Sequence, residues 1–298
     1  MKFFNREKEI REILNLIETE PKLINFIYGP INSGKTALIN EIVENKLNKN
    51  KYQVFFISLR GRFIEDYKSF IKVLFEIRKD NFFSKLKSIL KEFIYSLPSL
   101  VDKETIKKIS HGILSGIPID KKLLRSFMEN KDVEDVFVFL EGYFQRIRRE
   151  GKVPVIILDE LQVIGDLKVN GLLIYKLFNF FIHLTKEKHL AHVFCISSDS
   201  LFIERVYNEG KLEGRARYVL VDDFEKKKAL EFIDFYSKHV LKKVLDKKEK
   251  EKIYKVVGGK PIYLISVIDE LRIKPLEEIL NTFFQEEKGK DFNVFRKI

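Results

Sequence analysis

The sequence predicts an α/β sandwich in which a mostly parallel, five-stranded sheet is covered by helices on both faces. Short apolar runs of strand length alternate with segments of helical periodicity, which is the order typical of parallel sheets. The runs are continuously apolar rather than alternating, which indicates strands buried on both faces. They span residues 24–28, 53–59, 153–158, 192–197 and 217–221.

The first helix is predicted before the first strand, where Ile10, Ile13 and Ile17 recur at helical spacing until Pro21. A long helical insertion is predicted from about 62 to 150, between the second and third strands. Its apolar residues follow helical spacing in three sets, within 82–97, 106–117 and 133–147. Packing against the sheet explains these sets, and a partner surface or lid is the alternative.

The strand pattern stops after Phe224. Three helical patterns follow it, over residues 230–240, 262–268 and 276–283. The sequence therefore predicts two domains: an α/β domain over 1–223, which carries the insertion, and a small all-helical lid over 224–298.

A complete phosphate-binding motif, Gly-Pro-Ile-Asn-Ser-Gly-Lys-Thr, follows the first strand directly. Its two glycines let the backbone curl so that successive N–H groups point at one phosphate chain, and the next helix turns its positive end toward the anion. Lys35 would reach the outer phosphates, and the hydroxyl of Thr36 would bind Mg²⁺. The predicted binding residues are Gly29, Pro30, Ile31, Asn32, Ser33, Gly34, Lys35, Thr36 and Ala37. The motif predicts a P-loop NTPase.

Two carboxylates, Asp159 and Glu160, follow the apolar run at 153–158. At the carboxyl end of a strand beside the phosphate loop, Asp159 would hold Mg²⁺, directly or through a water. Glu160 would accept a proton from the attacking water. A solvated acidic pair is the alternative for these two residues alone, and the motif at 29–36 favours the catalytic interpretation.

Two further groups complete the predicted catalytic set. The fourth strand ends at Ser197 and Ser198, and a hydroxyl there can contact the γ-phosphate or the attacking water. We take Ser197 as the candidate for this hydroxyl, with Ser198 as the alternative. Charge in the transition state requires a cation, for which Arg215, just before the last strand, is the candidate, with Arg217 and Arg205 nearby.

Together these motifs resemble the archaeal-type ATPases of the AAA+ class, which are related to origin-recognition initiators and signal-transducing NTPase switches. Residues 3–10 match the family's Phe-x-x-Arg-Glu-x-Glu-Leu pattern, with Ile10 in place of Leu. Residues 159–162 match its Asp-Glu-x-Gln form, and Gly214-Arg215 matches its Gly-Arg before the last strand. Residues 258–264 match its Gly-Gly-x-Pro-x-Tyr-Leu helix start.

The resemblance implies a Mg²⁺-dependent ATPase that binds ATP or ADP between the core and the lid and acts as a conformational switch. It places Phe4 and Arg6 beside the adenine and Pro261 at a helix start that faces the nucleotide. It also places the strand ending at Ser197 between the loop strand and the Asp159 strand. The Gly-Gly-x-Pro form lacks a sensor Arg found in many relatives. Hydrolysis is therefore expected to be slow, or to depend on Arg215 of the same or a neighbouring chain.

Composition leaves the partners open. The 298 residues include 55 Lys and Arg against 44 Asp and Glu, a net charge of +11 that is spread along the chain. Local basic clusters lie at 146–152 and 242–248. A nucleotide-gated DNA-binding protein of initiator or mobile-element type is the alternative function. A protein partner bound through the insertion is a third possibility, and the oligomeric state is open.

The sequence also predicts a cytoplasmic protein, because its start turns polar early and it has no apolar stretch long enough for a membrane span. Relatives often carry a further C-terminal domain, and we expect a DNA-reading module after the lid to be absent or reduced. Cys195 is the single cysteine and is expected to be a buried core thiol. His189 and His192 are not expected to bind metal.

Overall fold

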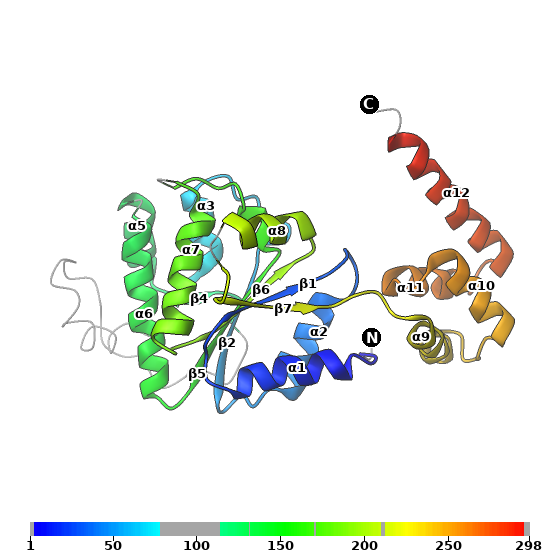
Figure 1. Ribbon diagram of the computed structural model, residues 1–298, viewed down its shortest axis with the longest axis horizontal. Helices are drawn as coiled ribbons and strands as arrows, with labels where there is room; N and C mark the ends of the chain where they lie inside the picture. Colours follow the sequence, from blue (N-terminus) through cyan, green and yellow to red (C-terminus); the bar gives the residue numbers. More distant parts are fainter. Residues whose placement is uncertain (1–2, 78–113, 131, 170, 210–211, 295–298) are drawn as a thin grey trace. The chain divides into compact units, whose positions relative to one another are not determined.

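The computed structural model describes residues 3–77, 114–130, 132–169, 171–209 and 212–294. Its centre is a five-stranded sheet in the order β2-β5-β6-β1-β7, in which every neighbouring pair is parallel (Figure 1). The strands are β1 (Ile24–Tyr28), β2 (Tyr52–Ser58), β5 (Val153–Asp159), β6 (His192–Ser197) and β7 (Ala216–Leu220). The predicted five-stranded α/β fold is confirmed. So is the position of the Ser197 strand between the loop strand and the Asp159 strand.

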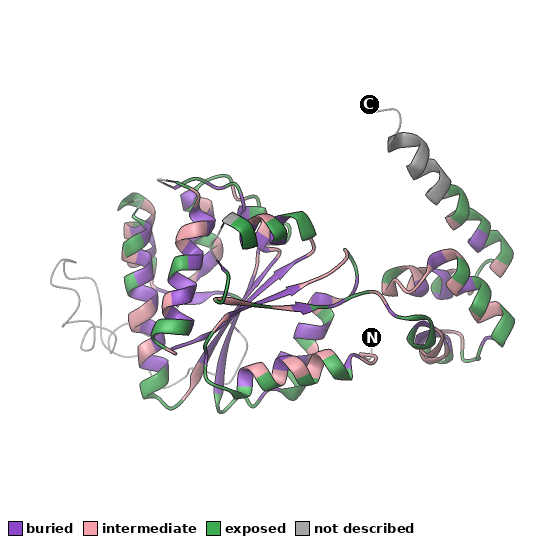
Figure 2. Ribbon diagram, viewed as in Figure 1, coloured by how far each residue is buried: buried purple, intermediate pink, exposed green. Residues whose placement is uncertain are grey.

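Helices cover both faces of this sheet, with α1 and α2 on one side and α6 and α7 on the other (Figure 1). The helices are α1 (Glu7–Glu18), α2 (Lys35–Glu41), α3 (Tyr67–Leu74), α5 (Lys121–Asn130), α6 (Val133–Arg149), α7 (Leu173–Ile182) and α8 (Ser200–Glu209). π-helical turns at Ile42–Lys46 and His183–Glu187 extend α2 and α7, and a 3₁₀ turn spans Leu161–Ile164. Figure 2 shows β1, β2, β5 and β6 mostly buried, as their continuous apolar runs predicted. For β7, the last strand in the sheet order, the prediction was wrong, because Arg217 and Leu220 are exposed. Cys195 is buried in β6.

The register of the sheet aligns the carboxyl ends of its strands. Asp159 at the end of β5 pairs with Ser58 on one side and Ile196 on the other. Ser197 at the end of β6 pairs with Tyr28, the last residue of β1. Parallel pairing therefore brings the residues that follow β1, β2, β5 and β6 to one edge, which we call the carboxyl edge.

The insertion between β2 and β5 contains a structure that the sequence did not predict. β3 (Phe75–Ile77) and β4 (Ile117–Ile119) form a two-stranded parallel sheet. Helical spacing at Ile117 was therefore the wrong interpretation, because two β-branched residues flank Pro118, which cannot donate a backbone hydrogen bond inside a helix. The pattern at 82–97 lies outside the described residues, and so does the part of the pattern at 106–117 that precedes residue 114.

The third predicted helix of the insertion is confirmed as α6, which belongs to the hydrophobic core. Val136 and Phe144 on α6 are fully buried, and Phe144 lies with its ring centroid 5.6 Å from that of Phe55 in β2. This helix packs against the sheet, as the simpler interpretation of the pattern required.

Four helices follow the last strand: α9 (Lys226–Val240), α10 (Lys247–Val257), α11 (Pro261–Glu270) and α12 (Leu276–Val294). They share a separate core that includes Phe232, Ile253, Leu264 and Ile279. α10 was not predicted, because its sequence is mostly Lys and Glu. A capping box formed by Asp246 and Glu249 starts it.

The chain divides into two compact units. The core unit comprises residues 7–28 and 36–220, and the helical unit comprises 1–6, 29–35 and 221–298. The helical unit thus takes in two short segments that lie far from the predicted lid in sequence. Among the helices of the described residues, none combines the length and the apolar character that a bilayer crossing requires.

Candidate functional site

The phosphate-binding loop connects β1 to α2, in the strand-loop-helix context that the motif requires. Gly29 and Gly34 have φ angles of 150° and 97°, a region that L-residues with side chains rarely adopt. The N–H of Ser33 donates to the carbonyl of Pro30 at 3.2 Å, which closes the turn. Both glycines thus occupy backbone conformations that favour glycine, and their role toward a phosphate stays a prediction.

Lys35 is buried, and its side chain folds over its own loop. Its ammonium donates to the carbonyl oxygens of Gly29 at 2.9 Å and Pro30 at 2.8 Å. A phosphate oxygen in the loop would compete with these two neutral acceptors for the same ammonium. Charge-assisted hydrogen bonds are about twice as strong as neutral ones, so the phosphate would win that competition.

Thr36, the second residue of α2, contacts Asp159 across the core unit. The Thr36 hydroxyl donates to Oδ2 of Asp159 at 3.2 Å. Asp159 is only 1% exposed, and its second oxygen, Oδ1, is buried without a hydrogen-bond partner. Burial, and next the nearby charge of Glu160, raise the pKa of Asp159 above its usual range.

A hydroxyl beside a buried carboxylate with one unused oxygen is a donor set suited to Mg²⁺, which prefers oxygen ligands. A divalent cation there would also relieve the electrostatic cost of the buried charge. The residues predicted to hold the metal are thus brought together, and their chemistry fits it.

Glu160 follows in a left-handed conformation, with φ of 62°. Both of its carboxylate oxygens are engaged. The guanidinium of Arg60 pairs with Oε1, and the amide of Gln162 donates to Oε2. One of these contacts must therefore open before an oxygen of Glu160 can accept a proton from a water.

Arg60 is a site residue that the sequence reasoning missed. It lies just after β2 and is 100 positions from Glu160 in the chain. The strand order β2-β5 brings the two together, because Ser58 pairs with Asp159. A lone Arg after a strand gives no local signal of this contact.

Ser197 joins the same network. Its hydroxyl donates to Oε1 of Gln162 at 2.9 Å and accepts from the N–H of Asp199 at 3.1 Å. Ser197 is buried at the carboxyl edge, whereas Ser198 is partly exposed. The structure therefore favours Ser197 over Ser198 as the hydroxyl coupled to Glu160 through Gln162.

Arg215 lies elsewhere. Its carbonyl accepts a hydrogen bond from the N–H of Ile24, the first residue of β1, at 3.1 Å. It therefore lies at the amino edge of the sheet, about 16 Å from the carboxyl edge given five residues in β7. Residues that precede parallel strands lie at the edge opposite to residues that end them, such as Asp159. A role of Arg215 beside Asp159 in the same chain is therefore not supported. A role toward a neighbouring chain stays a prediction.

The remaining predicted residues belong to the helical unit. The Phe4 ring packs on Phe224, Phe232 and Phe235. Arg6 donates to the carbonyl of Ser33 at 2.8 Å, so it contacts the phosphate loop. Pro261 is the first residue of α11, as predicted. The role of these residues toward adenine stays a prediction.

The phosphate loop, the acidic strand end and the parallel sheet define a P-loop NTPase of α/β type. Residues 3–267 match a family described as an ATPase domain found predominantly in Archaea. The chain belongs to this archaeal ATPase family.

The relatives and the fold agree with this assignment. The ATP-binding proteins MJ0632 and MJ0439 of Methanocaldococcus jannaschii are 54% and 51% identical to the chain. Each match covers 97% of the chain, and 79% and 76% of the relative respectively. Their names and the family together identify the chain as an ATP-binding protein.

Solved structures support the fold alone, since their identities are low. The Walker-type ATPase PABY2304 of Pyrococcus abyssi aligns with a TM-score of 0.64 at 18% identity, covering 99% of this chain and 75% of that one. The ORC2 protein of Aeropyrum pernix aligns with a TM-score of 0.51 at 11% identity, covering 94% and 66%. Both alignments show that the chain shares the fold of these two proteins.

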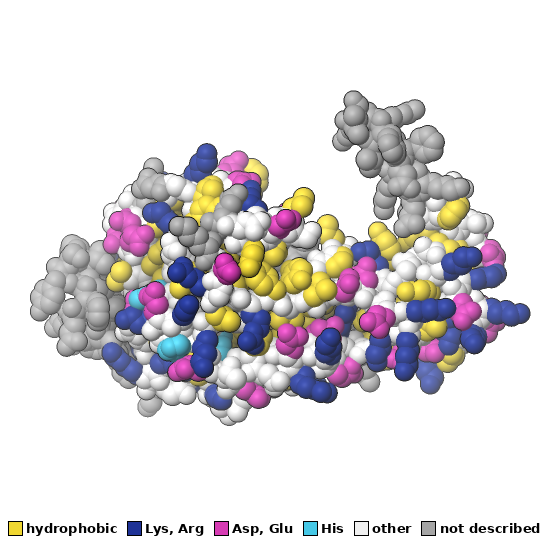
Figure 3. Space-filling view, viewed as in Figure 1, with side chains coloured by type: hydrophobic (Ala, Val, Ile, Leu, Met, Phe, Trp, Pro, Cys, Tyr) yellow, Lys and Arg dark blue, Asp and Glu magenta, His cyan; other side chains and the backbone are white. Residues whose placement is uncertain are grey.

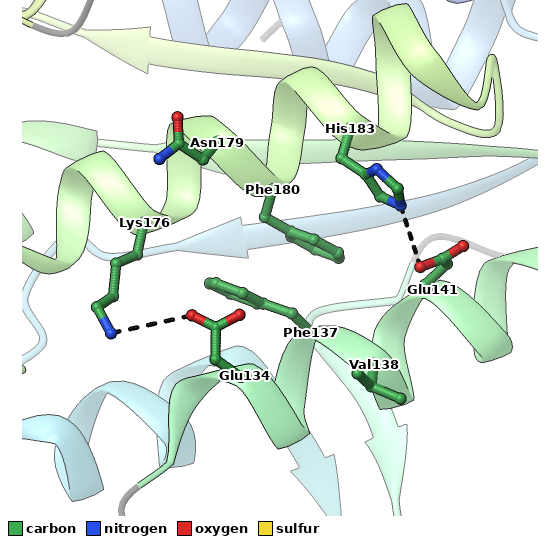
Figure 4. Close-up of a pocket in the computed structure, with 8 residues that line it drawn as sticks. All are labelled: Glu134, Phe137, Val138, Glu141, Lys176, Asn179, Phe180 and His183. Atoms are coloured by element: carbon green, nitrogen blue, oxygen red, sulfur yellow. Dashed lines mark hydrogen bonds and ion pairs between the residues drawn. The ribbon is translucent and has the colours of Figure 1, made fainter. Parts of the chain in front are cut away.

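A second concave feature of the core unit lies between α6 and α7 (Figure 4). This groove of about 390 Å³ is lined by the stacked rings of Phe137 and Phe180, whose centroids are 4.4 Å apart. Glu134 pairs with Lys176 at 3.9 Å and Glu141 with His183 at 3.1 Å across it. Its charged side chains already pair with one another, and none belongs to the predicted nucleotide site.

Proposed function

We propose that this protein hydrolyses ATP slowly and uses the bound nucleotide to switch its conformation. The observation that carries the proposal is the meeting of Thr36 with buried Asp159, whose Oδ1 has no partner, next to Glu160. Thr36 and Asp159 are 123 positions apart in the sequence, and the fold brings their side chains into contact. Such a donor set, whose hydroxyl directly follows a phosphate-binding motif in the sequence, is typical of phosphoryl-transfer enzymes.

Each residue has a defined task in this proposal. The amides of 29–34 and the ammonium of Lys35 bind the phosphates, while Thr36 and Asp159 hold Mg²⁺, which would neutralise charge on the outer phosphates. Glu160 accepts the proton of the attacking water once its contact with Arg60 loosens. Ser197 orients Glu160 through Gln162.

Slow turnover follows from two features of the site. Glu160 has both oxygens occupied, and Arg215 lies at the other edge of the sheet. Arg215 therefore does not stabilise charge in the transition state within its own chain. Where an arginine does so, it raises the rate of hydrolysis by roughly 10³-fold or more. A switch that holds ATP for a long time needs this low rate.

Two variants test the proposal. Lys35→Ala should weaken ATP binding, because it removes a charged phosphate contact. Glu160→Gln should bind ATP normally and lose turnover, because it removes the base and keeps the shape. ATP affinity and phosphate release are measured for both, and unchanged values in both variants would refute the mechanism.

A second function, nucleotide-gated DNA binding, is favoured by one feature of the helical unit. Five exposed lysines gather where α9 ends and α10 begins, at Lys238, Lys242, Lys243, Lys247 and Lys248. Elsewhere Lys and Arg are interspersed with Asp and Glu over the visible face (Figure 3). Affinity for duplex DNA should fall steeply with salt, differ between ATP and ADP, and drop when these lysines become glutamine. Weak binding with a flat salt dependence would exclude this function.

A protein partner that binds through the insertion is the third proposal, and the groove of Figure 4 is the surface for it. Deleting the insertion is a poor test, because Phe144 of α6 is part of the core. Val138 lines the groove and is 52% exposed, so Val138→Glu alters the surface and leaves the core intact. Loss of a partner from this variant alone would support the proposal, and retention would refute it.

A further inference from the structure

One short backbone segment of the helical unit, Val221–Phe224, contacts both glycine-rich motifs of the sequence. A Cβ on Gly29 in the phosphate loop would lie 2.2 Å from the carbonyl oxygen of Val221. A Cβ on Gly259 would lie 1.7 Å from the carbonyl oxygen of Phe224, whose N–H donates to the carbonyl of Gly259 at 2.8 Å. Neither contact tolerates a side chain. The segment is therefore packed between the phosphate loop and the turn before α11, and we call it the connecting segment.

Two cations tie the same segment to the phosphate loop. Arg6 donates from one nitrogen, Nη2, to the carbonyl of Ser33 at 2.8 Å and to the carbonyl of Asp222 at 2.6 Å. Lys260 donates to the carbonyl of Ile31 at 3.1 Å and pairs with the carboxylate of Asp223 at 3.3 Å. Each cation thus bridges one loop carbonyl and one of the two consecutive aspartates.

The two bridges differ in how readily they can open. Arg6 is 8% exposed and its guanidinium stacks over the Phe224 ring, 4.5 Å from the centroid. Lys260 is 23% exposed at its side chain, and its loop partner, Ile31, is 64% exposed. Lysine presents a mobile point charge, whereas arginine presents a fixed planar fork. The Arg6 bridge is therefore the permanent one, and the Lys260 bridge is the one that can exchange.

The connecting segment also leads directly into the helices. Phe224 belongs to the core of the helical unit, and α9 begins two residues later, at Lys226. Lys260 is the residue that precedes α11. A displacement of this segment or of Lys260 is therefore transmitted to two helices of the unit at once.

We propose that the connecting segment couples the phosphate loop to the helices of the same unit, with Lys260 as its exchangeable contact. The idea rests on the proposed function, since it requires a polyphosphate in the loop. An incoming polyphosphate attracts the Lys260 ammonium away from a neutral carbonyl and from Asp223. The restraint on the segment then changes with the occupant of the loop. Arg6 and Lys260 are positioning residues in this account.

The test compares amide hydrogen exchange with and without Mg·ATP in four full-length proteins: the wild type, Lys260→Ala, Lys260→Arg and Lys255→Ala. Lys255 is an exposed lysine on α10 and serves as the matched control. ATP affinity is measured separately for each protein by titration with a fluorescent analogue. Peptides over 221–224 and 258–264 report on the coupling, because the Phe224 N–H to Gly259 hydrogen bond lies between them.

In the wild type, we expect Mg·ATP to change exchange in these peptides about tenfold. Lys260→Ala, measured at a saturating concentration of Mg·ATP, should lose this response. Lys260→Arg should restore it at least in part, and Lys255→Ala should behave as the wild type.

The outcomes separate the two proposals. A wild type that does not bind ATP refutes the proposed function. A wild type that binds ATP without any response at 221–224 refutes the coupling alone. A Lys260→Ala protein with the full response, or an equal loss in Lys255→Ala, also refutes the role of Lys260.

Discussion

The two edges of the central sheet carry different chemistry, although the same five strands form both. At the carboxyl edge, two groups of side-chain hydrogen bonds follow the strands. Thr36 bonds to Asp159, and a second group links Arg60, Glu160, Gln162 and Ser197. At the amino edge, Arg215 holds the sheet through its backbone, and His192 is buried at the start of β6. The reactive residues are thus gathered at one edge only.

Strand direction explains the difference. In a parallel sheet every strand ends at the same edge, so residues that follow strands meet, and residues that precede strands meet at the other edge. Asp159 and Ser197 end their strands, whereas Arg215 precedes its strand. A residue near a catalytic motif in sequence can therefore lie a full strand length away from it.

The largest effect is expected at the metal site. Asp159→Asn should lower turnover at least about 100-fold, because the amide is a weaker ligand and carries no charge. Without Mg²⁺ the same variant should unfold at a higher temperature, because burying the charged carboxylate costs free energy. Asp166→Asn, at an exposed carboxylate, is the matched control. Full turnover in Asp159→Asn would contradict the assignment of the carboxyl edge.

The amino edge should show its effect in stability rather than in turnover. Burial, and next the charge of Arg148, lower the pKa of His192 to about 4, against about 6.5 in an unfolded chain. Between these two pH values the unfolded state binds more protons than the folded state. The contribution of neutral His192 to the free energy of unfolding is therefore fully present above about pH 6.5 and is lost as the pH falls toward 4. The full loss is roughly 3 kcal/mol.

Thermal unfolding between pH 7.5 and 4.5 measures this loss. His192→Leu should flatten the pH dependence, and His239→Gln, at an exposed histidine of the helical unit, should leave it unchanged. An unaltered slope in His192→Leu would show that the buried imidazole does not control it.

Ser197 and Ser198 give a matched pair within the carboxyl edge. Ser197→Ala should lower turnover about tenfold, because Gln162 loses the donor that orients it toward Glu160. Ser198→Ala should stay within about twofold of wild type. Equal losses in the two variants would remove Ser197 from the network.

Arg215 gives the smallest effect. At high dilution, where chains do not meet, Arg215→Ala should keep single-chain turnover within about twofold of wild type. A loss that grows with protein concentration would indicate that Arg215 acts on a neighbouring chain. A large loss at every dilution would contradict the contrast between the two edges.

Local patterns were enough to predict the five strands of the central sheet and to single out the phosphate-binding motif and the Asp159–Glu160 pair, since apolar runs and fixed motif spacing are properties of short segments. The same patterns missed β3 and β4. Contacts formed by distant segments were not predictable in this way. The pairing of Arg60 with Glu160 depends on strand order, and the contacts of Lys260 depend on the packing of 221–224. Helix α10 was missed because only a few apolar residues, such as Ile253, mark its buried face.

We propose that ATP is hydrolysed at the carboxyl edge. A single-turnover experiment, in which Mg·ATP is mixed with an excess of protein, tests this proposal. The wild type should convert bound ATP to ADP, and Glu160→Gln should hold ATP unhydrolysed with equal affinity. If Glu160→Gln produces ADP at the wild-type rate, or if neither protein retains ATP, the proposed hydrolysis of ATP at the carboxyl edge is contradicted.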